Sequence, residues 1–72
     1  MLKFVDYYRA KKSLITPIGI IPEGAIGNRS QYGDVIRFEG ISNDGDPMII
    51  TAFTDKVVEN EELFEIVEGW NE

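Results

Sequence analysis

The sequence predicts a small all-β barrel of about five strands, with a short helical or 3₁₀ turn before the last strand. The chain has 72 residues, which we interpret as a single domain (residues 1–72) without room for a two-sheet sandwich. Six of its seven glycines lie between positions 19 and 45, so turn signals come too close together for helices. Closure of the sheet protects the edges of short strands, which favours a strongly bent barrel.

The N-terminal part provides one strand, followed over residues 16–27 by an ordered loop or short strands with buried isoleucines. Residues 1–15 are rich in aromatic and β-branched side chains and are predicted as a strand, although the apolar spacing of the first 12 residues also fits a helix. Pro17 and Pro22 exclude a helix interior over residues 16–27. Within that segment, residues 21–24 have the composition of a turn with Pro in its second position and Gly in its fourth.

The central part contains the clearest strand. Residues 28–33 form a polar hairpin tip, and the alternation over residues 34–39 then directs Ile36 and Phe38 toward the core. Residues 42–47 carry Asp-Gly between two apolar runs, which is a strong hairpin signal.

The C-terminal part is predicted to complete the barrel. Residues 48–53 read as a strand, and its adjacent Ile49 and Ile50 suit a strand that is covered on both sides or twists at a barrel corner. Thr54 has the residue type of an N-cap for a short helical turn. Residues 63–67 form the closing strand. The predicted core gathers the inward residues of all these segments: Phe4, Ile15, Ile21, Ile26, Val35, Ile36, Phe38, Ile50, Phe53, Phe64 and Ile66.

Residues 21–27 (apolar, Pro, x, Gly, x, apolar, Gly), followed by a polar hairpin and a strand, resemble Src-homology-3-like small barrels. These barrels include KOW-type modules and short bacterial and phage proteins. The last predicted strand is similar to their final strand, and the resemblance covers residues 3–67. It implies the barrel architecture. The acidic-aromatic loops that bind proline-rich ligands and the basic loops of KOW modules are not visible in the sequence.

Residue types exclude most catalytic chemistry. The chain has neither histidine nor cysteine, which removes the commonest general base, the commonest metal ligand and the thiolate nucleophile. Lys12 and Ser13 would point to opposite faces of a strand. Asp44 and Asp46 lack the spacing of a calcium loop. We therefore predict a protein that is not an enzyme and has no metal site and no cofactor.

Charge is unevenly distributed along the chain. Residues 1–37 carry six basic and three acidic residues, whereas residues 38–72 carry one basic residue, Lys56, and ten acidic ones. The acidic half repels phosphates and argues against a nucleic-acid surface along the whole chain. Its acids either keep a small domain soluble or form an acidic face for a basic partner.

These features together predict a non-enzymatic module that binds a partner protein. Its size and acidity suit accessory or inhibitory proteins of bacteria, phages or prophages. Exposed aromatic residues and acids are the predicted contacts: Tyr8, Tyr32, Trp70, Glu61 and Glu62.

Two alternatives stay open. One is a nucleic-acid-binding barrel that uses the bases of its N-terminal part, namely Arg9, Lys11, Lys12 and Arg29. The other is a structural subunit whose strands pair with neighbours in an assembly, since the sequence leaves the oligomeric state open. The N-terminus lacks the plan of a signal peptide, and no apolar run reaches the length of a membrane span, so a cytoplasmic location is expected.

Overall fold

The computed structural model describes residues 1–68, which form seven strands and one short helix. The elements follow one another in the order β1 (Tyr7–Ala10), β2 (Leu14–Thr16), β3 (Gly19–Ile21), β4 (Ile26–Arg29), β5 (Val35–Ser42), β6 (Pro47–Phe53), α1 (Thr54–Glu59) and β7 (Phe64–Ile66). The predicted all-β class and the helical turn before the last strand are confirmed. The expected number of about five strands is too low, because residues 14–21 form the extra hairpin β2–β3.

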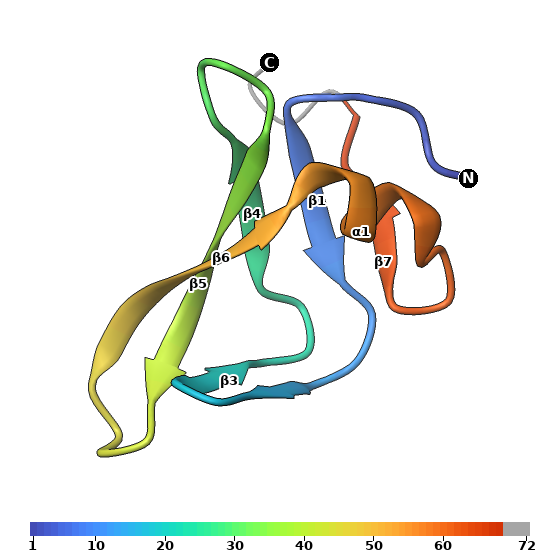
Figure 1. Cartoon of the computed structure of the whole chain (residues 1–72). Coiled ribbons are helices and arrows are strands. Elements are labelled where there is room, and N and C mark those ends of the chain that lie inside the picture. Colours follow the sequence, from blue (N-terminus) through green and yellow to red (C-terminus); the bar gives the residue numbers. More distant parts are fainter. Residues whose placement is uncertain (69–72) are drawn as a thin grey trace.

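All strands belong to one antiparallel sheet with the order β2-β3-β5-β4-β1-β7. The central strand is β5, which pairs with β4 and β3 along one edge and with β6 along the other. The sheet curls into a half-barrel, and α1 lies between the end of β6 and β7 (Figure 1). The structure is therefore compatible with the predicted small barrel.

The core lies on the concave side of the sheet. Side chains alternate along β5, so that Ile36 and Phe38 are fully buried as predicted. The ring of Phe38 packs against that of Phe64 from β7, with a distance of 5.2 Å between the ring centroids. The remaining buried hydrophobic residues are Tyr8, Ala10, Ile21, Ile50, Val57 and Val58.

Three predicted core residues lie on the surface. Ile15 is 87% exposed and Phe53 is 68% exposed, because each follows a residue whose side chain faces the core side of its strand. Phe4 is 53% exposed and precedes the first strand, which begins at Tyr7 rather than within residues 1–6. Val35, Ile26 and Ile66 are half-buried.

Two local predictions also need correction. The N–H of Ala25 donates to the carbonyl of Pro22, so Pro22 is the first residue of its turn and Gly24, with φ of 88°, is the third. A positive φ at the third position favours glycine. The N-cap of α1 is Phe53, and Thr54 is the first helical residue.

Within residues 1–68, none of the helices is long and apolar enough to span a membrane.

Candidate functional site

Tyr8, one of the predicted partner contacts, is fully buried in the core, so its prediction as an exposed anchor is wrong. Its hydroxyl donates to the carbonyl of Lys3 at 2.7 Å and accepts from the N–H of Val5 at 2.9 Å. Ala10 is a signal in the sequence for this burial. It lies two residues after Tyr8, on the same face of the strand, and is small enough for the interior.

The second aromatic contact, Tyr32, lies in the loop between β4 and β5 and is 88% exposed. It remains available to a partner. The third, Trp70, lies outside the described residues.

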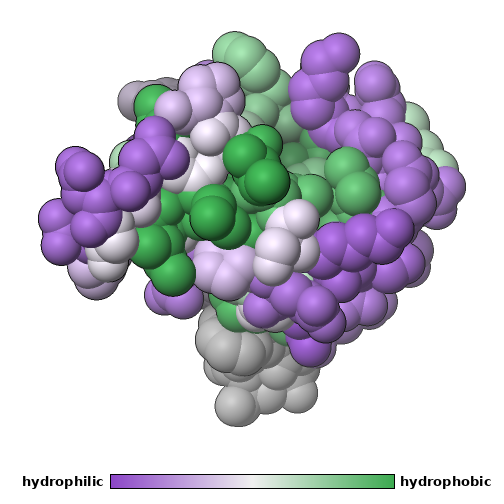
Figure 2. Space-filling view, turned by 90° about the horizontal axis from the view of Figure 1, so that it is seen from below, coloured by the Kyte–Doolittle hydropathy of each residue, from purple (hydrophilic) through white to green (hydrophobic). Residues whose placement is uncertain are grey.

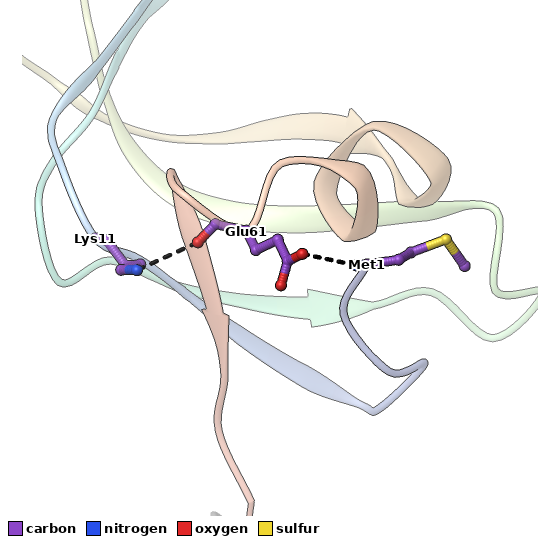
Figure 3. A network of polar contacts seen from close by, with 3 residues as sticks. All are labelled: Met1, Lys11 and Glu61. Atoms are coloured by element: carbon purple, nitrogen blue, oxygen red, sulfur yellow. Dashed lines mark hydrogen bonds and ion pairs between the residues drawn. The ribbon is translucent and has the colours of Figure 1, made fainter.

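Glu61 and Glu62 are exposed in the loop between α1 and β7. The Glu61 carboxylate lies 2.7 Å from the N-terminal ammonium of Met1, and its main-chain oxygen accepts a hydrogen bond from Nζ of Lys11 (Figure 3). The hydrogen bond and the charge of that ammonium hold the pKa of Glu61 below its usual value. Glu61 thus joins the N-terminal segment to the loop before β7, whereas Glu62 makes no ion pair within the described residues.

Three of the four bases of the nucleic-acid alternative have partners within the chain. Arg9 lies 3.5 Å from Glu65, and Arg29 lies 3.7 Å from Asp6. Lys11 donates to a main-chain carbonyl, and only Lys12 lacks an ion pair or hydrogen bond among the described residues. The structure does not bring these bases together into one open basic stripe.

The structure does not test the predicted absence of an enzyme activity, a metal site or a cofactor. Residues 1–68 contain no group of three or more acidic, histidine or cysteine side chains that could hold a metal ion. The Ser13 hydroxyl accepts a hydrogen bond from the N–H of Glu23, so it fixes the chain near the turn at residues 22–25.

The convex side of the sheet carries a surface that the sequence interpretation did not single out. Ile15 pairs with Ile20, and Ile20 pairs with Ile41, across three neighbouring strands. These three side chains are exposed by 87%, 42% and 42%, and Ile18 in the turn between β2 and β3 is exposed by 52%. We call Ile15, Ile18, Ile20 and Ile41 the isoleucine surface. Seen from the side of β2 and β3, hydrophobic residues gather in the middle of the molecule, with hydrophilic residues on both sides (Figure 2).

A signal for this surface exists in the sequence as pairs of adjacent apolar residues. Leu14-Ile15 and Ile20-Ile21 each place one side chain toward the core and the other outward. Ile49-Ile50 on β6 does the same, and Ile49 is 54% exposed. In a strand that is covered on one face, apolar and polar residues alternate. Pairs of adjacent apolar residues therefore indicate strands with two apolar faces.

A shallow groove adjoins the isoleucine surface on the same convex side. Its lining includes Tyr7, Ile26, Arg37, Glu39 and Ile49 from four neighbouring strands. Arg29 also lines the groove, so its lining carries two bases, Arg29 and Arg37, and one acid, Glu39. Arg29 lies 3.7 Å from Asp6, which is outside the lining.

Comparison with known proteins gives no significant match among family models, curated proteins or solved structures.

Proposed function

We propose that the chain is a non-enzymatic interaction module that binds a partner protein through the isoleucine surface. The observation that carries this proposal is the continuity of the surface, because the register makes Ile15, Ile20 and Ile41 direct neighbours. Single exposed hydrophobic residues are ordinary, whereas contiguous apolar patches with a polar rim mark interaction sites.

The fold type within this proposal is a Src-homology-3-like barrel. The order of elements supports it: the strand β1, the hairpin β2–β3, the strand β4, which a polar tip joins to the long hairpin β5–β6, and one helical turn before the last strand β7. The exposed apolar surface on β2, β3 and β5 is a feature of this chain, and the function is argued from it rather than from the fold.

The charges beside the surface favour a partner with basic residues around an apolar patch. Asp44 and Asp46 lie in the tip between β5 and β6, next to the strand that carries Ile41. Asn43 donates to the carbonyl of Pro17 at 3.1 Å, which holds this tip against the turn that carries Ile18. Both aspartates are exposed and make no ion pair within residues 1–68.

Site-specific photo-crosslinking in the native host tests the proposal. A crosslinking amino acid is placed singly at Ile15 and at Ile20, with Glu59 on the exposed face of α1 as the control position. We expect one and the same protein to be trapped from positions 15 and 20 but not from 59, and Asp44→Lys to weaken the trapping. Equal trapping from all three positions, no discrete product, or a product that nuclease removes would overturn the proposal.

A further inference from the structure

The outer edge of β6 is the longest strand edge that no other described strand covers. β2 and β7 also have free edges, but each has only three residues, whereas β6 has seven. Short edge strands are one of the devices by which proteins avoid unwanted pairing. With seven residues, β6 is not a short edge strand, so its length does not protect it from pairing.

The backbone groups that point from β6 to this free edge follow from the register with β5. The N–H of Thr54 donates to Asp34, and the N–H of Ser42 donates to Asp46, so the even-numbered residues of β6 bond to β5. The N–H groups of Ile49, Thr51 and Phe53 therefore point outward. No described residue outside β5 accepts from them.

The composition of the edge invites pairing. Residues 48–53 contain no charge, no glycine and no proline, and Pro47 protects only the first position. Ile49 and Phe53, on one face, are 54% and 68% exposed. Uncharged segments of this kind with high β propensity readily join a further strand.

We infer that two copies of this chain pair through β6, as antiparallel strands with a twofold axis at Thr51. In this register Thr51 pairs with its own copy, and Ile49 of one chain pairs with Phe53 of the other. A register centred one residue earlier would place Phe53 opposite Pro47, which has no N–H to donate. The Thr51 register thus provides donors on both strands and covers the two exposed apolar side chains.

The self-complementarity of the edge favours a second copy as the occupant. In the Thr51 register the same three residues, Ile49, Thr51 and Phe53, supply both sides of the contact, as a twofold interface requires. Each strand then satisfies the outward N–H groups of the other and covers its exposed side chains. The edge residues Ile49, Thr51 and Phe53 are distinct from the isoleucine surface, so the dimer leaves that surface open.

Single-cysteine variants test both the dimer and its register, since the chain has no cysteine of its own. Hydrogen-bonded partners in antiparallel strands have Cα atoms about 5.5 Å apart, within disulfide reach. We expect Thr51→Cys to form a covalent dimer under mild oxidation. Ile49→Cys is the matched control, because its two thiols would lie about 13 Å apart along the strands. Equal crosslinking of both variants, or none by either, would overturn the register.

Sedimentation velocity from micromolar to millimolar concentration measures the dimer without crosslinks. We expect the unmodified chain to dimerise, Ile49→Lys to remain monomeric and Ile15→Lys, with the same charge change on β2, to dimerise normally. Circular dichroism checks that both variants fold, which we expect because Ile15 and Ile49 are exposed. A monomer at all concentrations, or a dimer lost in Ile15→Lys but kept in Ile49→Lys, contradicts the inference. The photo-crosslinking result at Ile15 and Ile20 is independent of either outcome.

Discussion

The phenolic oxygen of Tyr8 lies 2.7 Å from the main-chain oxygen of Lys3 and donates a hydrogen bond to it. The same oxygen accepts from the N–H of Val5 at 2.9 Å. A core side chain on β1 thereby binds the backbone of the segment that precedes the sheet. The N–H of Leu2 in turn donates to the carbonyl of Val58, so this segment also contacts α1. Tyr8 is therefore a structural residue that fixes the N-terminal segment against the sheet.

Tyr8→Phe should therefore lower the free energy of unfolding by about 1–2 kcal/mol, because it leaves one carbonyl and one N–H without their partner. Urea unfolding followed by circular dichroism measures the change. Tyr32→Phe is the control, since Tyr32 is 88% exposed, and the same change there should have little effect. Equal effects of the two variants would show that the Tyr8 hydroxyl does not stabilise the fold.

For the hydroxyl of Thr54 we expect the opposite effect, namely that its removal raises the free energy of unfolding. Thr54 is 2% exposed, and its Oγ1 has no hydrogen-bond partner in the described part of the chain. Thr54→Val removes the unpaired hydroxyl at nearly constant shape and should stabilise the protein by about 1 kcal/mol.

Thr16 provides the matched comparison for that substitution. Its Oγ1 donates to the carbonyl of Gly19 at 2.7 Å and accepts from the N–H of Gly19 at 3.1 Å. Thr16→Val should therefore destabilise the protein by about 0.5–1.5 kcal/mol. Thermal unfolding of both variants checks the contrast, and a loss of stability in Thr54→Val would mean that its hydroxyl is satisfied.

Gly27 on β4 is fixed by packing. A Cβ at this position would lie 2.6 Å from Cγ2 of Ile36 and 2.6 Å from the ring of Phe38. Gly27→Ala should cost about 1–3 kcal/mol through overpacking, as measured by urea unfolding. Asn28→Ala, one residue on and exposed, should stay within about 0.5 kcal/mol. A neutral Gly27→Ala would indicate that the core under β4 can expand.

The fold class could be predicted because local signals agree with the final structure in residues 34–53. The alternation over Ile36 and Phe38 and the Asp-Gly tip between β5 and β6 define the long hairpin. For residues 16–27 the sequence predicts an ordered loop or short strands but not the hairpin β2–β3, because Pro17 occupies its two-residue turn. In a strand, alternate side chains point to opposite faces of the sheet. Where adjacent residues are both apolar, as at Leu14-Ile15, the sequence does not show which of the two faces the core.

The candidate site was less predictable for the same reason. Tyr32 is exposed as expected, but Tyr7 and Tyr8 are adjacent, and the sequence does not show that Tyr8 is the one whose side chain is buried. The isoleucine surface depends on pairing between residues that are far apart in the chain, such as Ile20 with Ile41. Such long-range register is not contained in any local pattern.

The contact between Glu61 and the Met1 ammonium predicts a pH dependence of stability. The ammonium lowers the pKa of Glu61 in the folded state below its usual value of 4.5. A lowered pKa means that the ionised carboxylate favours the folded state, so the contribution is complete above pH 4.5 and is lost as the pH falls through the lower, folded value. Because Glu61 is exposed, the effect should be small and should weaken with added salt.

Melting temperatures of the unmodified chain and of Glu61→Gln, measured from pH 7 to pH 2, test this pH dependence. The unmodified chain should melt at the higher temperature at neutral pH, and the difference should vanish at the acidic end. Acetylation of the N-terminus should reproduce the loss, and adding Glu61→Gln to the acetylated chain should cause little further change. Glu62→Gln, which breaks no ion pair within the described residues, serves as the control at neutral pH. A difference that persists unchanged at low pH would show that Glu61 acts through packing rather than charge.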